Sequence, residues 1–122
     1  MNKSAAKPTI LICDDEEGIR ESFKLILEET YDLRFATNGL EALEMLKTLS
    51  PSLMLLDIKM PKMHGMEILK QVKKLKPKLP VIIVTGYQSV EMSQEALKNG
   101  AADYIPKPFD SKEILKVVSR II

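Results

Sequence analysis

The chain has 122 residues, of which 45% are hydrophobic and 29% are charged. This length and apolar content suffice for one compact domain with a core, and a second domain does not fit. The 18 basic and 17 acidic residues nearly cancel to a formal net charge of +1, so no overall field attracts nucleic acid or an anionic membrane. We therefore expect no direct nucleic-acid binding by this domain.

The single cysteine, Cys13, excludes an internal disulfide and a four-cysteine zinc site, and is typical of a reducing compartment. Residues 1–8 are polar and small, without the apolar run of a signal peptide. The later apolar stretches are too short to cross a bilayer. We expect a cytoplasmic protein without membrane contact, built as a flexible N-terminal tail over 1–8 and a folded domain over 9–122.

Five apolar runs of strand length punctuate the chain, and they lie at 9–13, 31–36, 53–56, 81–84 and 102–105. The first, third and fourth runs are almost continuously apolar, as central strands covered on both faces would be. The second run alternates apolar and charged residues, which is typical of an edge strand. Between the runs, apolar residues recur three or four positions apart and form one stripe per predicted helix.

Polar residues mark where two of these helices begin. Asn38 with Glu41, and Asp110 with Glu113, have the spacing in which a short side chain caps a helix while the acid reaches back. Gly100 follows another helical segment and accepts the left-handed conformation that ends a helix. The predicted elements therefore alternate as strand and helix, five of each.

This alternation predicts an α/β fold, because right-handed crossovers of this length give a doubly wound parallel sheet with helices on both faces. A compact five-stranded sheet of this flavodoxin-like kind has the strand order 2-1-3-4-5. In that order the reversal lies between the first and third strands of the chain. A ligand site is therefore expected at the carboxyl ends of the strands.

Those carboxyl ends hold five chemically suggestive residues, one or two at each of four strand ends: Asp14, Asp15, Asp57, Thr85 and Lys107. Each has an ordinary structural explanation when taken alone, as a helix cap, a turn former, a local hydrogen-bond donor or a solvated charge. Together the acids need compensation, because a close pair of carboxylates repels by roughly 4 kcal/mol at an effective dielectric constant of about 20. The set therefore predicts a bound cation.

Mg²⁺ suits an all-oxygen site, since it takes one or two carboxylates together with water and phosphate oxygens. Lys107 offers a compact positive charge and Thr85 a hydroxyl donor, and both suit a phosphoryl group. Asp57 is the better candidate nucleophile because its strand is the most uniformly apolar, which fixes its position. Aspartyl phosphates are known intermediates of enzymes.

Four motifs then appear in a fixed order along the chain: ILICDDE, LMLLDIKMPKMHG, VIIVTGY and GAADYIPKPF. With these motifs the chain resembles the response-regulator receiver domains of bacterial two-component signalling, from about residue 9 to residue 122. The segment TGYQSVEMSQEALKNGAADYIPKPF is similar to that of receivers in enhancer-binding transcriptional activators. The resemblance implies that Asp57 is phosphorylated by a sensor histidine kinase.

The resemblance also implies a ligand set for Mg²⁺. Asp15 and Asp57 would bind the ion together with the backbone carbonyl of Lys59, and Asp14 would assist mainly through water. Lys59 itself departs from common family choices two residues after the acceptor, and so does Tyr87 two residues after Thr85. The lifetime of the aspartyl phosphate is therefore left open.

The resemblance further implies how the phosphoryl group is held and read. Thr85 and Lys107 would bind phosphoryl oxygens, the bond between Lys107 and Pro108 would be cis, and Tyr104 would be a rotameric switch residue. The output surface would be the face formed by the fourth helix, fifth strand and fifth helix. That face would act on an attached or separate effector, such as a transcription regulator, or on a second copy of the chain.

Two other functions compete with this interpretation. An aspartate-nucleophile phosphatase needs an acid two residues after its nucleophile, and this chain has Lys59 there. A flavodoxin-like cofactor binder needs a small, hydroxyl-rich phosphate loop after the first strand, and that place is occupied by four acids, Asp14, Asp15, Glu16 and Glu17. We therefore expect a switch that performs only its own phosphorylation and dephosphorylation, and no enzyme acting on external substrates.

Overall fold

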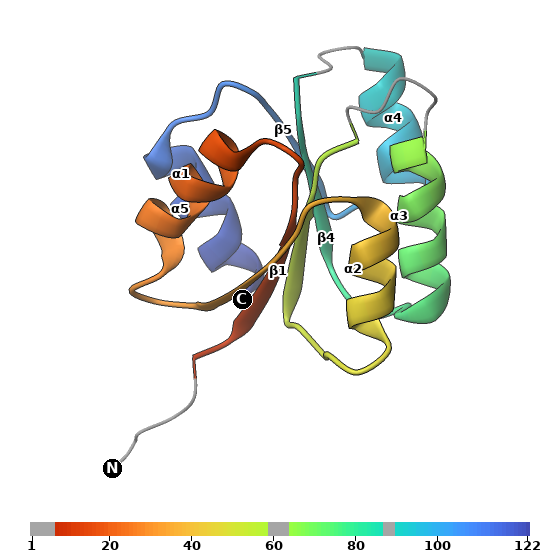
Figure 1. The fold of residues 1–122 in the computed structure, drawn as a ribbon. Coiled ribbons are helices and arrows are strands. Elements are labelled where there is room, and N and C mark those ends of the chain that lie inside the picture. Colours follow the sequence, from red (N-terminus) through yellow and green to blue (C-terminus); the bar gives the residue numbers. More distant parts are fainter. Residues whose placement is uncertain (1–6, 59–63, 87–89) are drawn as a thin grey trace.

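The computed structural model describes residues 7–58, 64–86 and 90–122. Strands and helices alternate along these residues (Figure 1). In chain order they are β1 (Thr9–Cys13), α1 (Glu17–Leu27), β2 (Asp32–Ala36), α2 (Gly39–Leu46), β3 (Leu53–Leu56), α3 (His64–Leu75), β4 (Val81–Thr85), α4 (Val90–Lys98), β5 (Asp103–Pro106) and α5 (Ser111–Ile121).

The strands form one parallel sheet in the order β2-β1-β3-β4-β5, which confirms the predicted topology. In the register of this sheet, Cys13 at the end of β1 lies between Ala36 of β2 and Leu56 of β3. Strand β2 is added on one side of β1, whereas β3, β4 and β5 are added on the other. The loops after β1 and β3 therefore diverge and leave a site at the carboxyl ends of these two strands.

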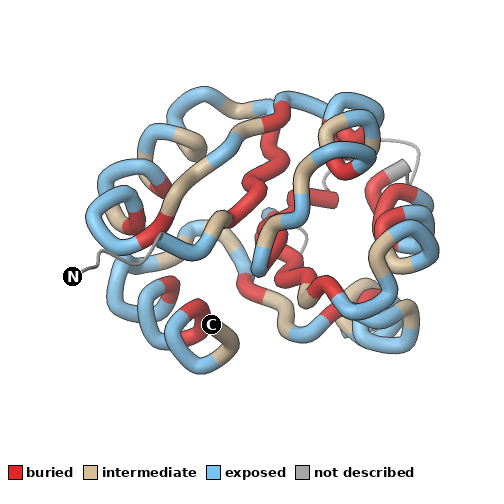
Figure 2. Tube along the Cα trace, turned by 90° about the horizontal axis from the view of Figure 1, so that it is seen from below, coloured by how far each residue is buried: buried red, intermediate tan, exposed pale blue. Residues whose placement is uncertain are grey.

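Helices cover both faces of the sheet, with α1 and α5 on one face and α2, α3 and α4 on the other (Figure 1). The residues of β3 and β4 are buried throughout, and so are those of β1 after Thr9 (Figure 2). Strand β2 is only partly buried, as its alternating pattern predicted for an edge strand. Burial of apolar surface in two core clusters, one on each face, therefore holds the strand ends in place.

The structure confirms three predicted helix ends, namely the starts of α2 and α5 and the end of α4. The Asn38 side chain accepts a 2.8 Å hydrogen bond from the Glu41 amide at the start of α2, and Asp110 accepts one from the Glu113 amide at the start of α5. After α4, Gly100 has a φ of +101°, the left-handed conformation that glycine tolerates best. Sequence periodicity and capping therefore place these helices correctly.

Four strand boundaries differ from the predicted ones by one residue, and one of them is the end of β5 at Pro106 instead of Ile105. Strands β2 and β5 each begin one residue later, and β4 extends to Thr85 because Thr85 pairs with Pro106 of β5. Of the expected tail, residues 1–6 lie outside the described residues. The carbonyl of Pro8 accepts a 2.9 Å hydrogen bond from the Asp32 amide, which ties the last residue of that tail to β2.

None of the helices in the part of the chain that the structure describes combines the length and the apolar character needed to cross a bilayer. The cytoplasmic location stays a prediction.

Candidate functional site

The sheet holds two of the predicted carboxylates in place by extending its hydrogen bonding one residue beyond the strands. The Asp57 amide donates to the Cys13 carbonyl at 3.0 Å, and the Asp14 amide donates to the Ala36 carbonyl at 3.1 Å. Both side chains are almost completely buried. Asp14 and Asp57 therefore project from adjacent strand ends with little positional freedom.

Lys107 directly follows the edge strand β5 and reaches these acids across the end of β4. Its Nζ lies 2.9 Å from Oδ2 of Asp14 and 3.1 Å from Oδ2 of Asp57. The exposed fractions of the three side chains are 10% for Lys107, 2% for Asp14 and 5% for Asp57. The backbone amide of Lys107 donates to the Thr85 carbonyl at 2.8 Å, which anchors the start of its loop to β4. The structure thus brings the Lys107 ammonium group to two carboxylates that precede it by 50 or more positions in the chain.

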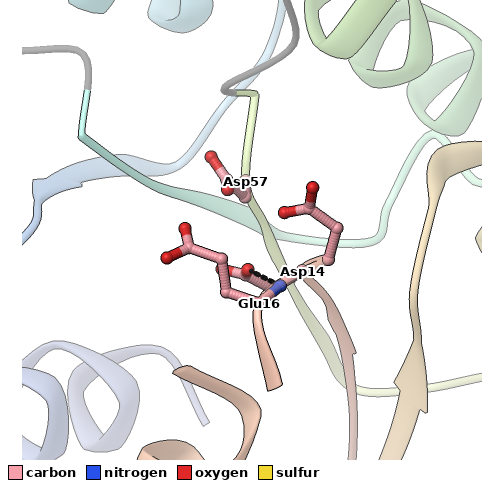
Figure 3. A group of neighbouring side chains, drawn as sticks. Asp14, Glu16 and Asp57 are labelled. Atoms are coloured by element: carbon pink, nitrogen blue, oxygen red, sulfur yellow. Dashed lines mark hydrogen bonds between the residues drawn. The ribbon is translucent and has the colours of Figure 1, made fainter. Parts of the chain in front are cut away.

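Glu16 also belongs to this site, although the sequence reasoning did not include it. Its carboxylate Oε2 lies 3.1 Å from Lys107 Nζ, and its amide donates a 2.9 Å hydrogen bond to Asp14 Oδ1. Figure 3 shows its carboxylate near those of Asp14 and Asp57, with the dashed line marking that amide bond. The signal for it was present in the acidic run that continues after Asp15.

Four acidic side chains gather at the site, and each offers one carboxylate oxygen that lies within 4.8 Å of the other three. They are Asp14, Asp15, Glu16 and Asp57. Oxygens on opposite sides of a Mg²⁺ ion are separated by about 4.2 Å, twice the usual bond length. A small inward movement of the side chains would therefore suffice for one ion. Asp15 is exposed, so its carboxylate can turn without breaking core packing. The donor set is all oxygen and fits Mg²⁺.

The carbonyl of Lys59, which the resemblance adds to this ligand set, lies outside the described residues. Tyr87 lies outside them as well.

Burial and charge both act on the protonation of the site. Burial raises the pKa of the Asp14 carboxyl, although the hydrogen bonds from Lys107 and from the Glu16 amide oppose that shift. Burial alone would lower the pKa of Lys107, but its hydrogen bond to Asp14 and the charges of Asp57 and Asp14 outweigh it and raise the pKa. Lys107 is therefore a permanent cation at neutral pH.

Cys13 lies next to this acidic site, in the buried end of β1. Burial and the charges of Asp14 and Asp57 raise the pKa of its thiol to about 12. A thiol with such a pKa is protonated and unreactive at neutral pH.

Thr85 and Tyr104 are the two predicted switch residues. Thr85 is completely buried at the end of β4. Tyr104 is partly buried in β5 and packs against the core cluster between the sheet and helices α2, α3 and α4. Burial raises the pKa of the Tyr104 hydroxyl, and the charge of Asp57 adds to that shift. The bond between Lys107 and Pro108 is cis, as the resemblance implied. Rotation of Tyr104 stays a prediction.

Comparisons with known proteins agree with this geometry. The family model described as "Response regulator receiver domain" matches residues 10–119. Sporulation initiation phosphotransferase F of Bacillus subtilis is 41% identical over 114 residues, which cover 93% of this chain and 92% of that protein. The DNA-binding transcriptional regulator NtrC of Escherichia coli is 46% identical over 115 residues, which again cover 93% of this chain but 24% of the relative.

The chain thus spans about a quarter of the length of NtrC and nearly all of the sporulation protein. Among solved structures, a CheY-like response regulator receiver domain protein from Methanospirillum hungatei superposes with a TM-score of 0.87 at 39% identity. That superposition covers 95% of this chain and 93% of the other. The likeness to NtrC agrees with the resemblance to receivers of transcriptional activators. On its matched length, strand order and acidic strand ends, this chain belongs to the response-regulator receiver domain family.

Proposed function

We propose that this chain is a phosphorylation-dependent signalling switch in which Asp57 accepts a phosphoryl group from a sensor histidine kinase. The observation that carries this proposal is the buried Asp57 carboxylate with the Lys107 ammonium group 3.1 Å from its Oδ2. The pair lies at the topological switch point of the sheet, where this fold places its ligands. Receiver domains as a family bind Mg²⁺ at an acidic pocket and interact with histidine kinases.

In the proposed reaction, a carboxylate oxygen of Asp57 attacks the phosphorus of a phosphohistidine. The new O–P bond forms as the N–P bond breaks, and the imidazole leaves with the bonding electron pair. Lys107 and the Thr85 hydroxyl would hold the phosphoryl oxygens, so positioning and electrostatic stabilisation supply most of the acceleration. No separate base is needed, because the Asp57 carboxylate attacks in its ionised form.

Mg²⁺ would be held by Asp15 and Asp57 with the Lys59 carbonyl, while Asp14 contributes through water. The ion supplies positive charge that offsets the repulsion between the acids and the incoming phosphate. Asp15 is suited to direct ligation because it is exposed and can turn, whereas the Asp14 Oδ2 atom is engaged by Lys107. The roles of Asp14, Asp15 and Asp57 follow the family pattern at positions where this chain has the matching residue, and Lys59 would contribute only its backbone carbonyl.

The phosphorylated state would be read at the face formed by α4, β5 and α5. Thr85 pairs with Pro106 in the sheet, and Tyr104 lies two residues before Pro106 on the same strand, so a shift of Thr85 is passed to β5. Exposed Val90 and Leu97 give α4 apolar surface for an effector or for a second copy of the chain. To change a 1:99 population into 99:1, the phosphoryl group must favour the active state by about 5.5 kcal/mol.

A phosphatase acting on external substrates fits this geometry poorly. A hollow of about 520 Å³ lies beside Asp57 and is lined mostly by apolar residues of β1, β3, α2 and α3. Among the described residues that line it, none carries a positive charge, and Glu67 adds a negative one. Apart from Lys107 at Asp57 itself, the described lining residues offer no cation to the rest of a phosphorylated substrate. We therefore propose that the chemistry is limited to phosphorylation and dephosphorylation of Asp57 itself.

The test is the intact mass of the protein after incubation with Mg²⁺ and acetyl phosphate. We expect the mass of one phosphoryl group to be added to the wild type, and none in Asp57→Asn or in the presence of a chelator. Asp32→Asn is the matched control, because Asp32 pairs with exposed Arg34 at the edge of the sheet. That variant should be phosphorylated like the wild type.

Failure of the wild type to gain mass from acetyl phosphate and from a phosphorylated histidine kinase would overturn the proposal. Continuous release of phosphate from a range of phosphorylated metabolites, abolished by Asp57→Asn, would instead favour the phosphatase.

A further inference from the structure

Lys107 is shared between three carboxylates, and the third of them has no role in the proposed reaction. Its Nζ lies 2.9 Å from Asp14, 3.1 Å from Asp57 and 3.1 Å from Glu16. Asp14 and Asp57 are buried, but the side chain of Glu16 is 42% exposed. Glu16 is therefore the acceptor that can leave Lys107 for solvent at the lowest cost.

The backbone of Glu16 is nevertheless held firmly. Its amide donates to Asp14 Oδ1, and its carbonyl accepts hydrogen bonds from the amides of Ile19 and Arg20 in the first turn of α1. Arg20 in turn donates to the Asp14 carbonyl at 2.9 Å. Because the backbone of Glu16 is fixed, only its side chain can rotate, and its carboxylate can return to Lys107 after each departure.

Phosphorylation changes what Lys107 must bind. Once an oxygen of Asp57 is esterified, its carboxyl group loses its charge and becomes a weak acceptor, while the phosphoryl group brings about two negative charges. Lys107 then has a stronger partner in the phosphoryl oxygens than in Asp57. Glu16 competes with that partner for the same ammonium group, and its charge also repels the phosphoryl group directly.

We propose that Glu16 is a positioning residue that holds Lys107 in the unphosphorylated state and weakens its grip on the phosphoryl group. This inference rests on the proposed function of Asp57 and adds a residue that tunes it. Glu16 therefore opposes occupation of the site by a phosphoryl group. The same charge should attract the metal ion, because the Glu16 carboxylate lies within 4.8 Å of the other three acids.

Neutralising Glu16 should therefore act on the two ligands in opposite directions. Glu16→Gln keeps the size of the side chain and its helix position but removes the charge. We expect about fivefold weaker Mg²⁺ binding and, at saturating Mg²⁺, about fivefold tighter binding of fluoroberyllate, an analogue of the phosphoryl group. Damage to the fold would weaken both, so opposite signs separate a positioning role from a structural one.

Glu17→Gln is the matched control, since Glu17 is the next residue, lies exposed in the same helical turn and makes the same change in net charge. Mg²⁺ affinity would be measured by isothermal titration calorimetry on the metal-free protein. Fluoroberyllate affinity would be followed by NMR at saturating Mg²⁺, with water leaving beryllium as the Asp57 oxygen bonds to it. Glu16→Asp retains the charge and should recover most of the Mg²⁺ affinity.

Weaker Mg²⁺ binding with tighter fluoroberyllate binding in Glu16→Gln alone supports the proposal. The proposal is overturned if Glu16→Gln matches Glu17→Gln in both titrations, or if both affinities of Glu16→Gln fall together. Failure of the wild type to bind fluoroberyllate at all would count against phosphorylation of Asp57 instead. The intact-mass experiment on the wild type and on Asp57→Asn tests phosphorylation of Asp57 independently of Glu16.

Discussion

Replacing Lys107 with methionine removes the ammonium group from the acidic site while keeping a side chain of similar length. The wild-type Nζ lies within 3.1 Å of oxygens from Asp14, Glu16 and Asp57. At an effective dielectric constant of about 20, two opposite charges 3 Å apart attract by about 5 kcal/mol. That figure is a ceiling for each pair, because removal of lysine also removes the cost of burying its charge.

The net effect follows from what is left behind. Glu16 is half exposed, and its pair contributes little because solvent screens it. Asp14 and Asp57 are left as buried carboxylates without the ammonium group between them, and breaking such a buried pair costs about 3–5 kcal/mol. We therefore expect Lys107→Met to lower the free energy of unfolding by about 3–5 kcal/mol, out of the 5–15 kcal/mol typical of a domain.

Urea denaturation without metal, followed by circular dichroism, measures this loss. Adding Asp57→Asn to Lys107→Met should recover part of it, because one of the two stranded charges disappears. Saturating Mg²⁺ should recover part of it as well, since the ion replaces the missing positive charge. A loss below about 1 kcal/mol, or a double variant no more stable than Lys107→Met, would refute the reasoning that Lys107 holds the buried acids together.

Three further changes test the structure. The pKa of Lys107 is raised above its ordinary 10.5, so the stabilisation from its charge is fully present below pH 10.5 and is lost as the pH rises through the folded pKa. Urea titrations of the wild type and of Lys107→Met should therefore give a difference in unfolding free energy that shrinks only at high pH. Gly65→Ala should destabilise by about 1–3 kcal/mol in the same assay, because its Cβ would clash with the Ile58 Cα. Gly18→Ala is the matched control, since its Cβ meets nothing within 4 Å, and it should stabilise α1. Asn38→Ala should cost about 1 kcal/mol in urea unfolding through loss of the helix cap.

The arrangement of strands was predictable because each central strand must be apolar on both faces. The continuous runs at 9–13 and 53–56 give the bounds of β1 and β3 without error. Thr85 was placed after its strand because a polar residue ends the apolar run, but backbone pairing with Pro106 depends on geometry and not on polarity. The same limit accounts for the one-residue differences at the starts of β2 and β5.

The acidic site was predictable as far as parallel topology determines it. Asp14, Asp57 and Lys107 each follow a strand, and parallel strands bring their carboxyl ends to one edge of the sheet. Glu16 follows no strand directly, and its place in the site depends on a lysine 91 positions later in the chain. Which of several neighbouring acids contacts that lysine is decided by rotamers and by the first turn of α1, and neither can be deduced from residue type.

The charges of the site explain why a metal ion, Lys107 and Glu16 act on one equilibrium. Among the described residues, four carboxylates gather here and Lys107 pairs with three of them, which leaves an excess of three negative charges. A divalent cation would reduce that excess to one. Phosphorylation would then add a net charge of only about 0.5 to 1, because the phosphoryl group brings about 1.5 to 2 negative charges while Asp57 loses its own. When Lys107 leaves Glu16, its ammonium group can pair with the phosphoryl oxygens and balance part of the added charge without a further ion. The lifetime of the phosphorylated state should therefore depend on residue 16 as well as on Mg²⁺ concentration.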